Sequence, residues 1–301
     1  MIKSILQTIA RLPISLKGWL PLRLGSKLSS FLPIAEQSDY ITSNLGVNNR
    51  FRMRLPIDKS SLVFGTPKHY SGERGVLFLS QILARSVNAV ADIGANWGYF
   101  TYFLKNGLSK DIPIYFFEPN EKLFSSIVWN IENNRLENVH GLMKGVSGNT
   151  GQASFFVNLT NDLSSTLDGS FANPDEELVE RKIEVTSFDD FVKSYGPDKK
   201  WLVKVDIENA EEQFIKGASN SMGQVTFLIM ELLEKARKAH LADQICQQFG
   251  MYAYYINDFK LEYMPREDGR YTAPEYNFLF CRLGPAELRE QVKDSPFKVL
   301  E

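Results

Sequence analysis

The sequence predicts an α/β protein in which helices cover both faces of a mostly parallel β-sheet with one antiparallel strand. From residue 72 onward, apolar segments of strand length alternate with amphipathic segments of helix length. Helices are the usual connection between parallel neighbouring strands. The last two predicted strands, 251–256 and 277–282, have only a hairpin-scale connection between them, so one of the two is expected to run antiparallel.

Each element follows from its own pattern. Alternating side chains over 44–64 predict a hairpin or a pair of strands, and the apolar positions of 72–85 lie on one side of a helix. Apolar runs bounded by turn residues predict further strands at 87–93, 113–118, 139–143, 152–158, 182–186, 201–206, 225–232, 251–256 and 277–282. Periodic apolar positions predict helices at 99–105, 121–133, 188–195, 210–216 and 235–249.

The amino terminus differs in character from the rest of the chain. Residues 1–43 are predicted to be an extension of the main domain at 44–301, whose core spans about 70–282. Residues 2–11 have the spacing of a short amphipathic helix, and the segment is basic, with no acidic residue before Glu36. Such a segment either packs on the main domain or contacts an anionic membrane surface through residues 1–35. No run approaches the ~20 apolar residues of a membrane-spanning helix.

The composition excludes several classes of function. With a net charge of −2 and 23% charged residues, the chain lacks the basic excess typical of nucleic-acid-binding proteins. Cys246 and Cys281 are too few for a disulfide framework, which indicates a reducing, cytoplasmic compartment. The three histidines lie far apart in the sequence, so no metal site is expected.

The segment 90–101 is the most informative for function. It reads Val-Ala-Asp-Ile-Gly-Ala-Asn-Trp-Gly-Tyr-Phe-Thr, so an apolar strand ends in Asp92, a glycine-bearing turn follows, and a helix begins. Ligands of doubly wound sheets lie outside the carboxyl ends of the strands, where glycine lets the backbone approach them closely. A dinucleotide fingerprint would require glycine at the positions of Asn96 and Tyr99. The turn therefore favours a nucleoside-type cofactor, with S-adenosylmethionine as the first candidate.

Glu118 is the second anchor of the predicted cofactor site. It ends the strand that follows the one with Asp92, and a carboxylate there can accept hydrogen bonds from both hydroxyls of a ribose. The alternative is a helix-start residue, because Pro119 suits the first helical position and acidic residues favour helix N-termini. Its place at the second strand end favours the ribose interpretation.

At this point the chain resembles the FkbM-type methyltransferases, which depend on S-adenosylmethionine and have a Rossmann-like methyltransferase fold. The resemblance rests on Asp-Ile-Gly-Ala-Asn-Trp-Gly at 92–98, Phe-Glu-Pro-Asn at 117–120, Gly-Val-Ser-Gly-Asn-Thr-Gly at 145–151, Lys-Val-Asp-Ile-Glu-Asn-Ala-Glu at 204–211 and Lys-Gly-Ala at 216–218. These segments extend over roughly residues 70–282. The first segment is specific when the segment at 204–211 follows it, and weak on its own.

The resemblance implies which residues hold the cofactor. The predicted cofactor-binding residues are Asp92, Gly94, Ala95, Asn96, Gly98, Glu118, Pro119, Ser147 and Asn149. The family usually has an acidic residue at the position of Gly148, so an adenine contact is either missing or supplied by Asn149. It usually has glycine at the position of Asn209, which tolerates a left-handed backbone better than most residues.

The predicted catalytic residues are acidic. Asp206 follows an apolar strand, Glu208 stands in the turn after it, and Glu231 ends the next strand. Carboxylates at neighbouring strand ends are expected to raise one another's pKa, which suits a general base. Lys204 either pairs with one of these acids or extends out of the strand. Candidate contacts to the acceptor are His69, Tyr70, Glu73, Ser164, Ser165, Thr166, Tyr276 and Asn277.

We therefore predict an S-adenosylmethionine-dependent O-methyltransferase that acts without a metal on a hydroxyl of a small molecule, a sugar or a natural-product intermediate. Transfer from a sulfonium requires mainly alignment, and an alcohol acceptor gains from a nearby base, with Asp206 or Glu208 in that role. The oxygen acceptor follows from the resemblance alone. The alternative is a catalytically silent relative that binds a nucleoside or a protein partner.

Overall fold

The computed structural model describes residues 40–44, 50–54, 71–159, 165–167, 177–233, 236–237, 239–265 and 277–301, with backbone only for 40–44, 50–54 and 71–73. Residues 1–39, which include the predicted amphipathic helix, lie outside the described residues. Within them, no helix combines the length and apolar character needed to span a bilayer.

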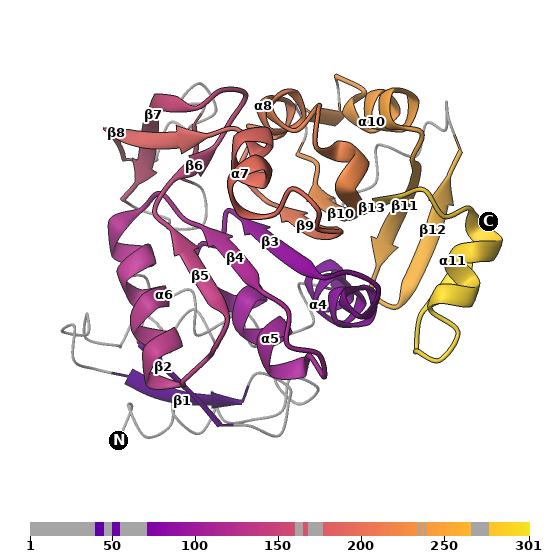
Figure 1. Ribbon diagram of the computed structural model, residues 1–301, viewed down its shortest axis with the longest axis horizontal. Helices are drawn as coiled ribbons and strands as arrows, with labels where there is room; N and C mark the ends of the chain where they lie inside the picture. The colour runs from indigo at the N-terminus through magenta and orange to yellow at the C-terminus, as the bar shows by residue number, and fades with distance from the viewer. Residues whose placement is uncertain are drawn as a thin grey trace.

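A nine-stranded sheet forms the centre of the molecule (Figure 1). From one edge to the other its strands are β14 (Lys298–Leu300), β12 (Lys260–Met264), β11 (Tyr252–Asn257), β13 (Asn277–Cys281), β10 (Val225–Glu231), β9 (Trp201–Val205), β3 (Ala89–Ile93), β4 (Ile114–Phe117) and β5 (Val139–Leu142). The five strands from β10 to β5 are mutually parallel, and β13 runs antiparallel to both of its neighbours. The predicted α/β fold with a mostly parallel sheet is confirmed, and three strands rather than one run opposite to the parallel set, because β12 and β14 have the direction of β13.

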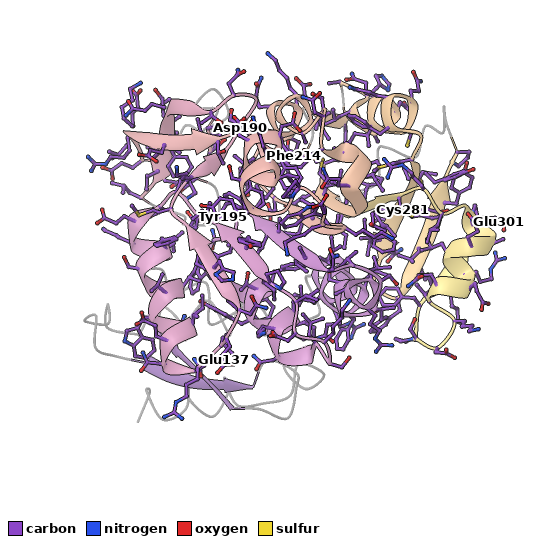
Figure 2. All side chains as sticks on the ribbon, in the orientation of Figure 1. Glu137, Asp190, Tyr195, Phe214, Cys281 and Glu301 are labelled. Carbon is purple, nitrogen blue, oxygen red and sulfur yellow. The ribbon has the colours of Figure 1, made fainter. Side chains whose placement is uncertain are left out.

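Helices cover both faces of this sheet, because successive side chains of each central strand point to opposite faces. On β9, Leu202 joins the hydrophobic cluster beneath α4 (Ser71–Leu83), α5 (Tyr99–Gly107), α6 (Glu121–Asn133) and α11 (Pro285–Gln291). Val203 joins the opposite cluster, beneath α7 (Phe188–Tyr195), α8 (Glu211–Gly217) and α10 (Leu241–Phe249). Phe214 of α8, labelled in Figure 2, packs in this second cluster.

The structure contains elements that the sequence patterns did not predict. Beyond β11, the sheet continues with the strands β12 and β14 at its antiparallel edge. The helix α11 was not predicted either. The unpredicted β6 (Gly145–Val146) joins the two predicted strands β7 (Gly151–Asn158) and β8 (Leu178–Thr186) in a separate three-stranded sheet of order β6-β8-β7. Two short 3-10 helices span Ala84–Ser86 and Met222–Gln224.

Two predicted elements begin elsewhere than expected. The strand pair in the amino-terminal region is β1 (Tyr40–Asn44) with β2 (Arg50–Arg54), which pair antiparallel. The helix expected over 235–249 is interrupted: residues 236–237 are helical, His240 has a left-handed backbone with φ of +54°, and α10 begins at Leu241. A non-glycine residue in that conformation separates α10 from the preceding segment.

The topology brings four strand ends together. In the sheet β3 lies between β4, which follows it along the chain, and β9, which comes much later. The strand order reverses at this point, and in such sheets the crevice for ligands opens outside the carboxyl ends of the strands. The ends of β3, β4, β9 and β10 therefore mark the candidate site.

Candidate active site

The turn between β3 and α5 has an unusual backbone. Gly94, Asn96 and Gly98 have φ angles of +78°, +51° and +76°. Glycine adopts such angles at no steric cost, and asparagine tolerates them better than most residues. A Cβ on Gly94 would lie 1.8 Å from the carbonyl oxygen of Asp206. The turn therefore lies directly against the chain that leaves β9.

The same turn is fastened to the end of β4. The amides of Gly94 and Ala95 donate to the carbonyl oxygen of Phe117 at 3.2 and 2.9 Å. The amide of Asn96 donates to Oε2 of Glu118 at 2.8 Å. The structure thus brings together the two anchors that the sequence predicted for a cofactor.

Glu118 joins the turn to the next loop as well. Its Oε1 accepts from the amide of Asn120 at 2.8 Å, across Pro119, while the Asn120 side chain accepts from the amide of Lys122 and caps α6. Glu118 is 5% exposed, and burial raises its pKa to about 8 although both amide hydrogen bonds oppose the rise. A carboxylate oxygen has two acceptor positions, so each oxygen keeps one for a ligand.

Asp92 is buried beneath the turn. Its Oδ2 accepts from the Thr101 hydroxyl of α5 at 2.7 Å, and its Oδ1 lies 3.9 Å from Nζ of Lys204. Burial raises the pKa of Asp92, while Lys204 and Thr101 act in the opposite direction. A direct contact between Asp92 and a cofactor stays a prediction, whereas its support of the turn follows from these contacts.

Lys204 occupies the middle of the polar contacts. Its Nζ lies 3.0 Å from Oδ2 of Asp206 and 3.4 Å from the carbonyl oxygen of Gly94, in addition to its approach to Asp92. Its side chain is 11% exposed. The sequence left open whether Lys204 pairs with an acid, and the structure shows that it pairs with two.

Asp206 differs from the sequence expectation. Burial raises its pKa, but Lys204 and a hydrogen bond that Asp206 accepts from Glu231 outweigh burial and hold the pKa below its ordinary value. The expectation that neighbouring carboxylates raise one another's pKa is therefore wrong at Asp206, because the adjacent ammonium and the donated hydrogen favour its charged form. Asp206 is ionised at neutral pH, and the Glu231 side chain is hydrogen-bonded to it.

Glu208 and Asn209 form the turn before α8, with φ angles of +50° and +72°. The amide of Asn209 donates to Oε1 of the buried Glu211 at 3.0 Å, and the Thr166 hydroxyl donates to the carbonyl oxygen of Glu208. Asn209 thus has the left-handed backbone that glycine would adopt. Thr166, a candidate acceptor contact, holds this turn in place.

The loop with Ser147 and Asn149 has other contacts. The amide of Ser147 donates to the carbonyl oxygen of Thr186 at 3.0 Å. The carbonyl oxygen of Ser147 lies so close to Gly217 that a Cβ on that glycine would be 2.1 Å from it. Asn149 is exposed. The hydrogen bond of the Ser147 amide leads to β8 and not to Glu118, so the role of Ser147 and Asn149 in cofactor binding stays a prediction.

Some candidates cannot be placed. His69, Tyr70, Ser164 and Tyr276 lie outside the described residues, as does the side chain of Glu73. The Ser165 hydroxyl accepts from the amide of Asn158 at 3.1 Å, and Asn277 pairs with Glu231 across β13 and β10. In the described part of the chain, no group of three or more His, Cys, Asp or Glu side chains is arranged to hold a metal ion.

Sequence reasoning missed two contributions to the site. Thr101 on α5 holds Asp92, and the amide of Asn120 holds Glu118. A signal for Thr101 was present: it is a fully buried polar residue on the otherwise apolar and aromatic inner side of α5, where a hydroxyl needs a partner.

The chain is similar to known methyltransferases. The family model described as "Methyltransferase FkbM domain" matches residues 92–257, which include both anchors and all three predicted catalytic acids. The hexuronic acid methyltransferase AglP of Haloferax volcanii is 27% identical over 230 residues, covering 75% of this chain and 83% of that protein.

Two solved structures are also similar. The methyltransferase FkbM of Methylobacillus flagellatus KT has 15% identity and a TM-score of 0.45, over 74% of this chain and 52% of that one, so the chain spans about half the length of that structure. The precorrin-6y C5,15-methyltransferase of Geobacter metallireducens GS-15 has 11% identity and a TM-score of 0.37, over 69% and 87%. Because the family model matches more than half of its residues, the chain belongs to the FkbM methyltransferase domain family and is a methyltransferase.

Proposed function

We propose that this methyltransferase uses S-adenosylmethionine and transfers the methyl group to an oxygen atom, a hydroxyl of a small molecule, a sugar or a natural-product intermediate. The observation that carries the proposal is the bond from the Asn96 amide to Glu118 at 2.8 Å. It joins the turn that contains Gly94 and Gly98 to a buried carboxylate at the crevice where such sheets bind ligands.

The residues present fit the cofactor. Glu118 would accept from the two ribose hydroxyls with the acceptor positions that its backbone hydrogen bonds leave free. Gly94 and Gly98 would keep side chains away from the methionine half. When bound, S-adenosylmethionine supplies a methyl group that is already activated for transfer to a nucleophile.

The acidic residues next to this crevice support an oxygen acceptor. Asp206 is an ionised carboxylate at the end of β9, next to the Gly94 turn. It would take the proton of the acceptor hydroxyl as the oxygen becomes nucleophilic, which typically contributes ~10²–10⁴-fold to the rate. Glu231 would hold Asp206 in place, and Glu208 in the adjacent turn is the second candidate base.

The acceptor class rests on similarity. The relative in Haloferax volcanii is named a hexuronic acid methyltransferase. A hexuronic acid offers two kinds of oxygen, a hydroxyl and a carboxylate, and only the hydroxyl gains from a base because the carboxylate has no proton to lose. The ionised Asp206 favours the hydroxyl, since a carboxylate acceptor would meet like charge there.

A transfer assay with product analysis tests the proposal. The purified protein is incubated with S-adenosylmethionine carrying a labelled methyl group and with paired acceptors, a neutral hexoside and the matching hexuronide. We expect a methyl ether that survives mild alkaline treatment. A labelled product that alkali hydrolyses is a methyl ester, and it would overturn the hydroxyl assignment while leaving cofactor use intact. Absence of binding to S-adenosylmethionine in calorimetry would overturn the cofactor assignment.

A further inference from the structure

Lys204 is a charged residue in a strand that otherwise carries only apolar side chains. β9 reads Trp-Leu-Val-Lys-Val, and its other four residues are fully buried. Lys204 lies in register with Asp92 on β3 and with Ile229 on β10. An ammonium taken out of water is costly unless acceptors surround it, and an apolar side chain of similar length would fill the same space. The acceptor groups around Lys204 must therefore explain why a lysine stands at this position.

Those acceptors belong to two different parts of the site. The carbonyl oxygen of Gly94, at 3.4 Å, and the carboxylate of Asp92, at 3.9 Å, belong to the cofactor turn and its support. The carboxylate of Asp206, at 3.0 Å, belongs to the catalytic acids. The backbone makes the same connection, because the absent side chain of Gly94 lets the turn touch Asp206.

We propose that Lys204 is a positioning residue that locks Asp206 and the cofactor turn into one unit. This inference rests on the proposed function, because it gives the turn and Asp206 their roles. Lys204 touches neither the methyl group nor the acceptor in this assignment. It fixes the direction of the Asp206 carboxylate, and it holds the Gly94 carbonyl so that the turn keeps its left-handed shape.

The charges around Lys204 make its effect on Asp206 measurable. Asp92 faces Lys204 from β3, and Glu118, just after β4, also interacts with Lys204. Glu231, at the end of β10, is hydrogen-bonded to Asp206. All three are acidic, so among these groups of the described part of the chain, loss of the ammonium leaves only carboxyl groups facing Asp206. Its pKa must then rise, because burial is no longer opposed by a nearby positive charge.

The test compares Lys204→Met with Lys204→Arg and with Lys105→Met. Lys105 is a matched control, since it is 15% exposed and pairs with Asp111 at 2.7 Å near the far end of α5. NMR titration of the carbon-13-labelled Asp206 carboxyl is the main readout, with Asp206→Asn to assign the signal, and it needs neither cofactor nor acceptor. Calorimetry with S-adenosylhomocysteine is the second readout.

In Lys204→Met we expect the Asp206 midpoint to rise by about one pH unit or more, and S-adenosylhomocysteine to bind about tenfold more weakly. Lys204→Arg should restore the midpoint in part, and Lys105→Met should change neither value. Should Lys204→Met not fold, the double variant Asp92→Asn/Lys204→Met removes both charges of the buried pair, and its Asp206 midpoint should lie above that of Asp92→Asn alone.

An Asp206 midpoint at the wild-type value in a folded variant without the lysine overturns the inference, and so does unchanged affinity for S-adenosylhomocysteine. The proposed function fails differently, through a wild-type protein that binds no S-adenosylhomocysteine. The two failures are therefore distinguishable.

Discussion

The two halves of the candidate site are held together by different kinds of contact. At the ends of β3 and β4, backbone groups make most of the contacts: two amides share the Phe117 carbonyl, and two more bind Glu118. At the ends of β9 and β10, charged and polar side chains make the contacts, because Lys204 and Glu231 are both hydrogen-bonded to Asp206. Backbone contacts fix a shape, whereas charged side chains fix protonation states. The half at the ends of β3 and β4, the proposed cofactor half, therefore suits recognition, and the half at the ends of β9 and β10, the proposed acceptor half, suits chemistry.

The largest expected effect lies in the acceptor half. Asp206→Asn removes the charge and keeps the size, so methyl transfer should slow by ~10²–10⁴-fold while S-adenosylhomocysteine binds within a few-fold of wild type. Single-turnover rates and calorimetry on the same preparation check this. Normal single-turnover rates in Asp206→Asn would exclude this residue as the base and leave Glu208 as the candidate.

The next largest effect is expected from a substitution that distorts the turn after β3. In Gly94→Ala the new methyl would lie 1.8 Å from the Asp206 carbonyl, at a φ of +78°, so we expect a loss of about 3 kcal/mol in the free energy of unfolding. Urea denaturation measures it. Gly223→Ala is the control, because nothing lies within 4 Å of its Cβ position and its φ is not positive. Equal stability of the two variants would contradict the tight approach.

Glu118→Gln tests the half at β3 and β4 through the pH dependence of stability. An acid whose pKa is raised from 4.5 to about 8 makes the folded protein bind a proton that the unfolded chain has lost, so stability falls as pH rises through that window. The glutamine variant should lack this fall. It should also bind S-adenosylhomocysteine at least tenfold more weakly, about 1.4 kcal/mol, because an amide cannot accept at both ends.

Cofactor binding should release a proton near pH 7, since the carboxylate must be ionised to accept from ribose. Calorimetry in buffers of different ionisation enthalpy detects that release. Glu137→Gln is the control, an exposed glutamate after α6 that Figure 2 labels. If wild type and Glu118→Gln show the same proton release, Glu118 is not the ionising group.

The smallest expected effect concerns the turn after β9. Asn209 already has a φ of +72°, so Asn209→Gly relieves a modest strain and should change the free energy of unfolding by less than about 1 kcal/mol. Thermal melting and transfer assays check this. A large gain in activity would mean that the asparagine side chain obstructs the acceptor half.

The difference between the halves also explains what the sequence could predict. Glycine spacing and an acid at a strand end are local signals, so the meeting of Asn96 with Glu118 was foreseeable. The lowered pKa of Asp206 was not, because it depends on where the Lys204 side chain points and on the partner that donates to Asp206. The strands β12 and β14 were missed because short edge strands at the end of an α/β pattern carry little periodic signal.

The close approach of Gly94 to the Asp206 carbonyl has a practical consequence for redesign. A library that aims at new acceptors should leave position 94 unchanged, since a side chain added there would displace Asp206 together with the turn. Any substitution at position 94 would therefore change both halves of the site at once.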